Sequence, residues 1–375
     1  MKVLVTGAAG FVGRNLCVEL ARRADVDLLR FDLDTPARGL DEGLAQADVV
    51  FHLAGVNRPD NVEEFHKGNA ELTRRICAKV IALGHKPKIV LSSSIQAELD
   101  NPYGMSKRVA EESILAYTEK TSAAGVVYRL KNLFGKWCRP NYNSVTATFC
   151  HNVANGLPIQ VSDPANVVEL TYIDDVVAAF LAELSDKQPG FRMADALPSH
   201  SASLGELAAL VKSFRDSRQT LLPPDFSRPF VRALYATYLS YLPTDGFAYG
   251  LDVKTDPRGK LAEFIKQPCF GQIFVSRTRP GATRGNHFHH TKVEKFLVIE
   301  GEAVIRFRPI EGAEVTQYPV RGEDFKVVDI PPGYTHSIEN VGSGDLVTLF
   351  WSSQVFDEAK PDTAFLPVLK QGEPT

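Results

Sequence analysis

The stretch "VTGAAGFVG", residues 5–13, decides the fold of the first half of the chain. Its three glycines, Gly7, Gly10 and Gly13, follow an apolar run and precede a stretch with apolar residues at four-residue spacing. A strand, a glycine-rich turn and a helix in this order let the backbone approach a pyrophosphate, whose charge is met by free N–H groups at the helix N-terminus. The stretch therefore predicts a dinucleotide site. The alternative is a glycine-rich turn that binds no ligand, which would have the same sequence pattern.

The residues around this loop extend the predicted coenzyme site. Asp32, which ends the second apolar run, has the position of a carboxylate that accepts a hydrogen bond from the adenosine ribose, and this favours NAD. Arg14 could instead pair with a 2′-phosphate or be an ordinary surface arginine, so the residue types leave NADH and NADPH open. The complete set of predicted coenzyme-binding residues is Gly7, Gly10, Phe11, Val12, Gly13, Arg14, Asp32, Leu53, Ala54 and Gly55.

The composition favours a two-domain protein that acts on small molecules. At 375 residues and 44% hydrophobic content, the chain can fill two cores. Its net charge of −3 lacks the positive surplus with which nucleic-acid and membrane-surface binders neutralise phosphates, so we expect neither partner. The five cysteines form no CxxC pair, which argues against a disulfide framework. The chain starts without a signal-like segment, and we expect a cytoplasmic protein.

Two patterns follow each other along the chain. Up to about residue 185, short β-branched runs alternate with helical segments, which predicts a Rossmann-type, doubly wound parallel sheet. From residue 251 onward, short strands are separated by Gly and Pro, which predicts an all-β sandwich or barrel. Pro243 and two glycines in "YLPTDGFAYG", residues 241–250, break the helical pattern. We therefore predict domains at residues 1–243 and 244–375.

The segment "NPYGMSK", residues 101–107, predicts a site for hydride transfer. Tyr103 and Lys107 lie four apart, on one face of a helix that Pro102 can start. We expect the lysine to lower the pKa of the phenol, which suits the phenol to protonate a carbonyl oxygen as hydride arrives at carbon. Ser94, in "LSSSIQ" (residues 91–96), could hold the same oxygen.

These motifs, together with "HLAG", "YRLKNLFG" and "TYIDDVV", resemble the extended short-chain dehydrogenase/reductases that act on nucleotide sugars. The resemblance covers about residues 1–240. It implies that Ser94, Tyr103 and Lys107 form the catalytic triad. It also implies that the stretch beginning at Asn132 meets the nucleotide diphosphate, and the implied substrate-binding residues are Asn132, Lys136, Arg139 and Asn143.

The segment "GNHFHH", residues 285–290, predicts a metal site. His287 and His289 alternate on a predicted strand and so point to one face. Glu294 follows, and "PPGYTHSIEN" (residues 331–340) supplies His336. Three imidazoles and one carboxylate suit Zn²⁺, Fe²⁺, Mn²⁺ or Ni²⁺, and we expect a divalent metal, with Zn²⁺ as the first choice.

Residues 281–301 and 331–340 resemble the two signature motifs of the cupins, which are jelly-roll barrels. Just before them, "DPRGKLAEFIK" (residues 256–266) resembles the entry to cupins that epimerise 4-keto-deoxysugar nucleotides. Those enzymes do not usually need a metal, so here a metal would either polarise the ketone or only hold strands together. The candidates for the base that acts at C3 are His290, Lys292, Lys295 and Tyr334, each of which could also be an ordinary rim side chain.

Over nearly its full length the chain resembles one family of bifunctional enzymes of capsular polysaccharide and O-antigen synthesis. The resemblance implies a homodimer that acts on UDP-2-acetamido-2,6-dideoxy-β-L-arabino-4-hexulose, a UDP-activated 4-keto-deoxyaminosugar. The cupin would epimerise C3, and the reductase would then reduce C4 with NADPH, or with NADH. The product would be UDP-2-acetamido-2,6-dideoxy-L-talose, on the way to UDP-N-acetyl-L-fucosamine. One alternative is an NAD-dependent nucleotide-sugar epimerase or dehydratase with a non-catalytic dimerisation or sugar-sensing cupin; another is a cupin dioxygenase.

Overall fold

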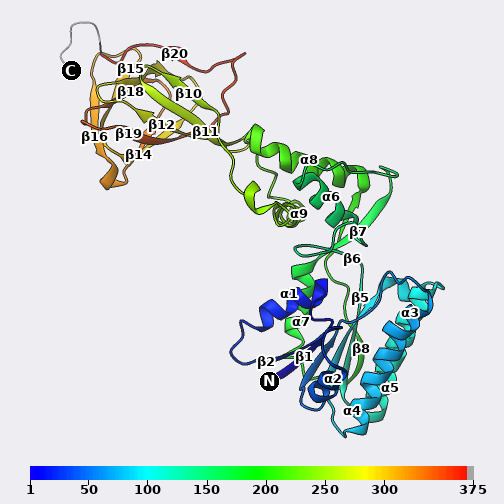
Figure 1. Cartoon of the computed structure of the whole chain (residues 1–375). Coiled ribbons are helices and arrows are strands. Elements are labelled where there is room, and N and C mark those ends of the chain that lie inside the picture. Colours follow the sequence, from blue (N-terminus) through cyan, green and yellow to red (C-terminus); the bar gives the residue numbers. More distant parts are fainter. Residues whose placement is uncertain (370–375) are drawn as a thin grey trace. The chain divides into compact units, whose positions relative to one another are not determined.

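The computed structural model describes residues 1–369, and the chain divides into two compact units (Figure 1). The first unit comprises Met1–Arg215 and Asp225–Thr244; the second comprises Asp216–Pro224 and the residues from Asp245 onward. The short segment belongs to the second unit because it bonds to it: the carbonyl of Leu221 accepts a hydrogen bond from the N–H of Lys266 at 2.9 Å. The functional division at residues 243 and 244 stays a prediction.

The first unit is built on a six-stranded sheet whose neighbouring strands all run parallel. In spatial order the strands are β2 (Asp27–Phe31), β1 (Lys2–Thr6), β3 (Val49–His52), β4 (Lys88–Ser94), β5 (Ala124–Leu130) and β8 (Gly190–Met193). The chain runs outward from β1 to β2 and returns to the other side of β1 at β3. In open α/β sheets, ligands bind at the carboxyl ends of the strands beside such a reversal.

Helices cover both faces of this sheet (Figure 1). Successive residues of β1 point to opposite faces, with Val3 and Val5 in one core and Leu4 in the other, so the whole strand is apolar. The helices on one face are α1 (Phe11–Leu20) and α7 (Ile173–Ala182), and those on the other are α2 (Ala37–Leu44), α4 (Leu72–Ala82) and α5 (Pro102–Thr121). Short helical segments precede α4 and α5: α3 (Glu63–Phe65), the π-helix η1 (His66–Glu71) and the 3₁₀-helix η2 (Ile95–Glu98).

A small sheet with its own core completes the first unit. Its strands β6, β7 and β9 pack with helices whose buried face includes Phe149, Phe214 and Leu234. The bounds are β6 (Asn132–Phe134), β7 (Val167–Tyr172), β9 (His200–Ser203), α6 (Val145–Ala154), α8 (Leu204–Thr220) and α9 (Pro229–Leu239). The end of α8, from Asp216 onward, belongs to the second unit. Residues that follow β6 therefore enter the first unit's site from a different layer than those that follow β3 and β4.

The second unit is a pair of antiparallel sheets around an apolar core that includes Phe296, Phe307 and Phe350. One sheet has the order β10 (Val253–Asp256), β11 (Gly259–Gln267), β12 (Gly271–Thr278), β19 (Leu346–Ser352), β14 (Glu294–Glu300) and β17 (Val327–Ile330). The other has the order β16 (Thr316–Arg321), β15 (Glu302–Pro309), β18 (Tyr334–Asn340), β13 (Thr283–Phe288) and β20 (Ala364–Phe365). Two 3₁₀ turns, η3 (Thr244–Gly246) and η4 (Gly322–Asp324), lie between elements. The predicted fold class, a Rossmann-type sheet followed by an all-β cupin-like domain, is confirmed.

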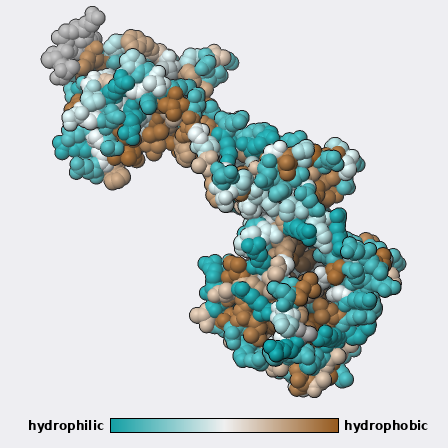
Figure 2. Space-filling view, viewed as in Figure 1, coloured by the Kyte–Doolittle hydropathy of each residue, from teal (hydrophilic) through white to brown (hydrophobic). Residues whose placement is uncertain are grey.

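Hydrophobic residues on the visible face form separate groups between hydrophilic ones (Figure 2). Within residues 1–369, no helix has both the length and the apolar character that crossing a bilayer requires.

The core of the first unit gives a stability prediction. Phe51, on β3, is fully buried and stacks on Phe180 of α7, with ring centroids 5.6 Å apart. We expect Phe51→Ala to lower the free energy of unfolding by about 3–5 kcal/mol, because it removes a buried ring and leaves a cavity. Leu83→Ala is the control, since Leu83 is 45% exposed and its loss should change stability by less than about 0.5 kcal/mol. Chemical denaturation of the full chain measures both; equal small effects would contradict the prediction.

Candidate functional site

The glycine loop forms a cradle that side chains would fill. Gly7 has a positive φ of 70°, and a Cβ on it would lie 2.7 Å from the N–H nitrogen of Ala54. A Cβ on Gly13 would lie 2.0 Å from the carbonyl oxygen of Gly7. Helix α1 begins directly after Gly10, with no side-chain cap and no acidic residue in its first turn, so its first N–H groups are available to a phosphate. These features fit a nicotinamide dinucleotide.

The remaining predicted coenzyme residues surround this cradle. Asp32 follows β2, and its carboxylate accepts hydrogen bonds from the N–H groups of Ala9 (2.7 Å) and Leu33 (2.8 Å). Leu53, Ala54 and Gly55 follow β3 on the other side of Gly7, while Phe11 and Val12 pack their side chains against the core. The guanidinium of Arg14 stacks over the ring of Trp137 at 4.5 Å, which engages Arg14 with the loop after β6.

Ser94, Tyr103 and Lys107 come together at the carboxyl end of β4. The Tyr103 hydroxyl is hydrogen-bonded to Ser94, and the Lys107 ammonium lies 5.8 Å from the centroid of the Tyr103 ring and donates to the carbonyl of Ser92. Helix α5 is positioned by Asn101, whose side chain caps it by accepting from the N–H of Gly104. This arrangement can hold a carbonyl oxygen between two hydroxyl groups.

The neighbouring serines are engaged elsewhere. The hydroxyl of Ser93 donates to Glu111 at 2.5 Å, and that of Ser92 faces the carbonyl of His52 at 3.4 Å. Ser94 also accepts from the N–H of Gln96, which starts the turn η2. Of the three serines in the run, Ser94 is thus the one beside the phenol of Tyr103.

Burial sets the protonation of this group, and here one expectation was wrong. Burial raises the pKa of the Tyr103 phenol, and the hydrogen bond with Ser94 opposes this effect only in part. The Lys107 ammonium lies 5.8 Å from the centroid of the ring, and its positive charge does not outweigh the effect of burial on the phenol's pKa. Burial also lowers the pKa of Lys107 to about 8, with Glu111 opposing. At neutral pH the phenol therefore carries the proton that a reduction requires.

The predicted substrate-side residues lie in and after β6, but they are not all free to bind. Lys136 forms an ion pair with Asp174 at 2.5 Å, and the amide of Asn132 donates to the carbonyl of Glu169. Asn143 is exposed in the loop before α6. Arg139, also exposed, stacks over the ring of Tyr142, with a distance of 4.9 Å from its guanidinium carbon to the ring centroid.

Sequence patterns did not single out Arg58, Tyr142 or Asn69, which also lie in this region. Arg58, in the loop after β3, also lies over the Tyr142 ring, at 5.9 Å, so two guanidinium groups share one aromatic side chain. Asn69 lies in η1, accepts from the N–H of Val56 and donates to Ser106, which ties the loop after β3 to α5, the helix that carries Tyr103 and Lys107. These pairs are separated by up to 84 residues along the chain, and no spacing pattern reveals them.

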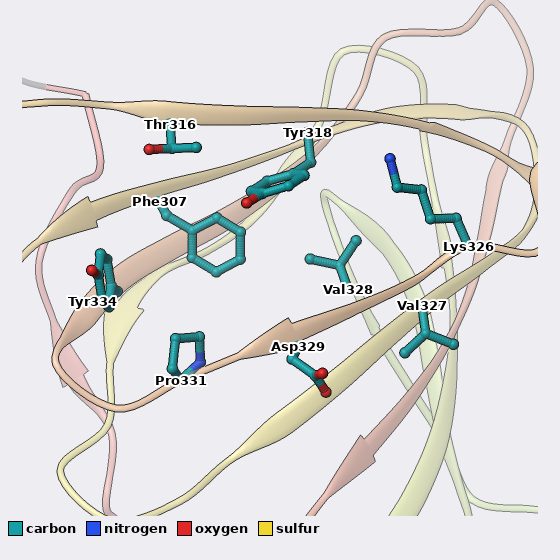
Figure 3. Close-up of a pocket in the computed structure, with 9 residues that line it drawn as sticks. All are labelled: Phe307, Thr316, Tyr318, Lys326, Val327, Val328, Asp329, Pro331 and Tyr334. Carbon is teal, nitrogen blue, oxygen red and sulfur yellow. The ribbon is translucent and has the colours of Figure 1, made fainter.

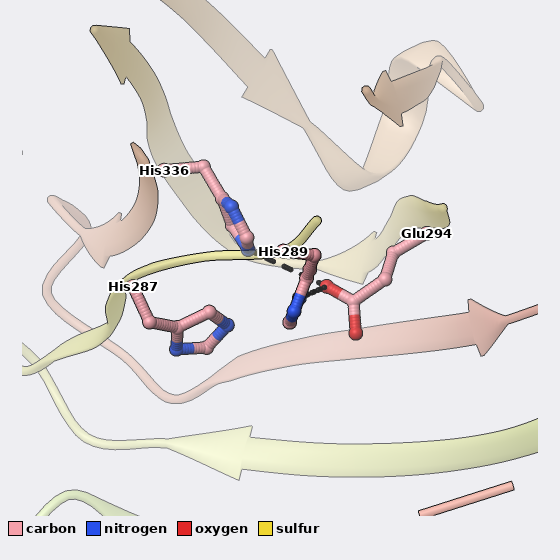
Figure 4. A group of neighbouring side chains, drawn as sticks. All are labelled: His287, His289, Glu294 and His336. Carbon is pink, nitrogen blue, oxygen red and sulfur yellow. Dashed lines mark ion pairs between the residues drawn. The ribbon is translucent and has the colours of Figure 1, made fainter. Parts of the chain in front are cut away.

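The barrel brings the four predicted metal ligands together (Figure 4). Their ligand atoms all lie within 4.8 Å of one another, because His287 and His336 are directly paired between β13 and β18 while Glu294 begins β14. Nε2 of His289 and Nε2 of His336 each lie 3.4 Å from the same oxygen of Glu294. Burial and the neighbouring imidazoles lower the pKa of His287 to about 4, so its ring is neutral and able to ligate at neutral pH.

Unsatisfied nitrogen atoms in this cluster test whether it fits a metal. Nε2 of His289 and both ring nitrogens of His336 are buried without a hydrogen bond to any described residue. Buried polar atoms are normally paired, and apart from the Glu294 carboxylate, 3.4 Å from each Nε2, these nitrogens have no polar partner among the described residues. A divalent cation with N and O ligands fits that requirement.

A segment far along the chain holds one ligand in place. The backbone carbonyl of Asp362 faces Nδ1 of His289 at 2.5 Å, which assigns the proton to Nδ1 and leaves Nε2 free to ligate. The Asp362 carboxylate accepts from the N–H groups of His290, Thr291 and Lys292, at 2.8–2.9 Å. The sequence contains no spacing signal that identifies Asp362.

The four candidates for the C3 base have different environments. His290 packs edge-on against Phe288 outside the metal cluster, and Lys295 is paired with Asp329. Lys292 is buried, with its amine 3.2 Å from the hydroxyl of Thr363, and the side chain of Tyr334 is partly exposed. No role for any of these candidates follows from these contacts.

Comparisons with known proteins agree with this geometry. Residues 3–192 match the model of the NAD dependent epimerase/dehydratase family, and residues 254–364 match the Polysaccharide biosynthesis C-terminal domain. The chain is 45% identical to the UDP-2-acetamido-2,6-beta-L-arabino-hexul-4-ose reductase of Pseudomonas aeruginosa, over 97% of this chain and 98% of that protein. The crystal structure of the capsular polysaccharide assembling protein CapF from Staphylococcus aureus is 44% identical, with a TM-score of 0.92 over 98% of this chain and 100% of that one.

A crystal structure of CapF with the inhibitor 3-isopropenyl-tropolone is also similar, with 40% identity and a TM-score of 0.87 over 98% of this chain and 100% of that one. The family predicted from the sequence is confirmed, as is the prediction of a nicotinamide-dependent enzyme. The chain belongs to the NAD dependent epimerase/dehydratase family, within the group of full-length relatives of the UDP-2-acetamido-2,6-beta-L-arabino-hexul-4-ose reductase.

Proposed function

We propose that this chain is a bifunctional enzyme that epimerises C3 of UDP-2-acetamido-2,6-dideoxy-β-L-arabino-4-hexulose in its barrel and then reduces the C4 ketone in its parallel-sheet unit. The product is UDP-2-acetamido-2,6-dideoxy-L-talose, on the way to UDP-N-acetyl-L-fucosamine. The observation that carries the proposal is the protonated phenol of Tyr103 beside the hydroxyl of Ser94, in a chain similar over nearly its whole length to a named ketosugar reductase. We further propose a cytoplasmic homodimer.

The reduction needs a proton at the ketone oxygen. A bound nicotinamide supplies the hydride to C4. Ser94 donates a hydrogen bond to the C4 oxygen and so orients the carbonyl, and Tyr103 gives its phenolic proton to the same oxygen as negative charge develops there. Lys107 stabilises the phenolate that remains, because its ammonium lies on the same face of α5 as Tyr103.

The epimerisation uses the same ketone before it is reduced. Removal of the C3 proton leaves an electron pair that moves into the C4 carbonyl, so the intermediate is an enolate. Return of a proton to the opposite face of C3 inverts that centre and restores the ketone. Reduction then removes the acidity of C3, so the inverted configuration is fixed.

We propose that His287, His289, Glu294 and His336 bind a divalent metal, with Zn²⁺ as the first choice. Nε2 of His289 and both ring nitrogens of His336 support the site, since they are buried and form no hydrogen bond with a described residue. The tropolone in the related CapF structure supports it as well, because a tropolone presents two adjacent oxygens of the kind that chelate metals. A bound metal would supply positive charge beside the ketosugar and hold β13, β14 and β18 together.

We propose NADPH as the preferred coenzyme, with NADH also accepted. The resemblance to NADPH-dependent reductases supports NADPH, while Asp32 supports NADH, since its carboxylate lies beside the glycine loop where the adenosine ribose is expected. A 2′-phosphate at that place would be repelled by the carboxylate. We therefore expect a substitution of Asp32 to change the preference between NADH and NADPH.

The first prediction tests the reductase. We expect Tyr103→Phe to lower the rate of NADPH oxidation with the UDP-4-ketosugar by about 10²–10⁴-fold, because the proton donor is lost. Tyr235→Phe, on α9, is the control and should keep the wild-type rate, since its hydroxyl forms no hydrogen bond with a described residue. Stopped-flow absorbance at the nicotinamide band measures both. Turnover of the sugar by the wild type without net consumption of coenzyme would instead favour the epimerase or dehydratase alternative.

A second prediction concerns the coenzyme. We expect Asp32→Ser to raise kcat/KM for NADPH relative to NADH by about tenfold or more, since the like-charge contact with a 2′-phosphate is removed. Steady-state kinetics with each coenzyme at a fixed ketosugar concentration measure the ratio. If the ratio is unchanged, Asp32 does not face the ribose, and its carboxylate only accepts the hydrogen bonds from the N–H groups of Ala9, in the glycine loop, and Leu33.

A third prediction concerns the metal. We expect Asp362→Ala to weaken Zn²⁺ binding by about 10–100-fold, because the turn that carries His289 loses its anchor. Asp357→Ala is the matched control, since that carboxylate accepts a single N–H, from Ala359, and should leave the affinity unchanged. Competition with a chromogenic chelator measures the dissociation constants, and thermal denaturation of the metal-free proteins shows that both variants fold. Equal affinities would contradict a positioning role for Asp362.

A further inference from the structure

The barrel has a pocket where the edges of its two sheets meet. β17 is the last strand of one sheet and β16 the last strand of the other, and between them lies a cavity of about 400 Å³ (Figure 3). That volume lies within the range of about 300–1,000 Å³ that is typical of small-molecule sites. The residues that matter for its chemistry are Phe307, Thr316, Tyr318, Lys326 and Tyr334.

Three aromatic rings shape the pocket. Phe307 lies in the middle, and the rings of Tyr318 and Tyr334 flank it (Figure 3). Both tyrosine rings stand nearly perpendicular to that of Phe307, at 90° and 86°, with centroid distances of 5.7 and 6.4 Å. A ring-shaped ligand can lie flat on Phe307 between the two tyrosines.

Most polar groups around these rings have no hydrogen-bond or ion-pair partner among the described residues. Among the residues that the structure describes, none forms a hydrogen bond with the hydroxyl groups of Thr316, Tyr318 or Tyr334. Lys326 forms no ion pair with a described carboxylate, and its ammonium lies 5.9 Å from the centroid of the Tyr318 ring. The carboxylate of Asp329 is already paired with Lys295. The pocket therefore offers hydroxyl groups and one unpaired positive charge, which suits an anionic ligand rich in oxygen atoms.

One residue that lines the pocket, Phe307, is a neighbour of a residue of the metal cluster. Phe307 is directly opposite His336 in the β15–β18 register, and both side chains are buried. Directly opposed residues on one face of an antiparallel pair have Cβ atoms about 4.5–5.5 Å apart. Tyr334 precedes His336 by two residues on β18 and so faces the same side of the strand. Phe307 thus separates the pocket from His336, which is fully buried behind it, while Lys326 lies near Tyr318.

We propose that this pocket binds the sugar diphosphate end of the nucleotide sugar, with the ketosugar on Phe307 toward His336 and the diphosphate at Lys326. The proposal rests on the proposed epimerisation in the barrel, and it names the surface that recognises the substrate of that step. It explains why the only unpaired charge among the described residues of the pocket is positive, and why Phe307 and Tyr334 lie toward the metal cluster while Tyr318 lies near Lys326.

The test is carried out on the full chain with two independent measurements. Fluorotyrosine labelling gives a ¹⁹F resonance for Tyr318, which is assigned by its loss in Tyr318→Phe, and UDP is the probe. We expect this resonance to shift on addition of UDP in the wild type, and to shift much less in Lys326→Ala. No shift at millimolar UDP would overturn the proposal.

The second measurement is the incorporation of solvent deuterium at C3 of the UDP-4-ketosugar, without coenzyme. We expect Lys326→Ala to raise the apparent KM for exchange about tenfold or more, because a charge-assisted phosphate contact is lost. Lys326→Arg, which keeps the positive charge, should have a KM for exchange close to that of the wild type. Lys254→Ala is the matched control, since Lys254 is exposed on β10, at the opposite edge of the same sheet, and should leave KM unchanged.

The outcomes separate this proposal from the proposed function. If the wild type exchanges deuterium but Lys326→Ala and Lys254→Ala have the wild-type KM, the pocket proposal is overturned and the epimerase function stands. If the wild type shows no exchange but UDP still shifts the Tyr318 resonance, the pocket is a nucleotide site and the epimerase function fails. Thermal denaturation confirms that each variant is folded.

Discussion

The first unit depends on how closely α1 approaches the end of β1. A Cβ on Gly13 would lie 2.0 Å from the carbonyl oxygen of Gly7, so only glycine allows the helix to start there. Because it starts there, its first N–H groups point along the edge at which every strand of the parallel sheet ends. The hydroxyl groups of Ser94 and Tyr103 lie at the same edge, at the carboxyl end of β4. One backbone contact thus brings the coenzyme cradle and the proton donor to one side of the sheet.

In the second unit the corresponding constraint is the pairing of β13 with β18. A bulge between Gly285 and His287 leaves Asn286 unpaired, with a positive φ of 60°, and sets His287 directly opposite His336. The carbonyl and side chain of Asn286 then accept hydrogen bonds from Leu366 and Val368. The bulge therefore both assembles the ligands and attaches the C-terminal segment whose Asp362 holds His289. The grouping of the four predicted metal ligands and the course of the last described residues are two consequences of one irregular pair of strands.

Local spacing made part of this structure predictable. Glycines after a strand, a tyrosine and a lysine four apart on a helix, and histidines two apart on a strand each fix which side chains share a face. Long-range contacts escaped prediction, because the sequence does not show which distant segments meet: Asp362 reaches His289 across 73 residues, and Arg58 meets Tyr142 across 84. The raised pKa of Tyr103 also escaped, since it depends on how deeply the phenol is buried rather than on which residue is nearby.

The proposed chemistry explains why two unrelated folds belong in one chain. A C3 hydrogen is acidic only while C4 is a ketone, so a barrel that received the reduced sugar would have no proton to remove. Inversion alone is reversible, because the enolate accepts a proton on either face. Hydride transfer in the first unit ends that exchange by converting the carbonyl into an alcohol, and the protonated phenol of Tyr103 supplies the proton that this step requires at neutral pH. Fusing the two folds keeps the reversible and the irreversible step equimolar, so every inverted ketosugar is formed on a chain that also carries the site that fixes it.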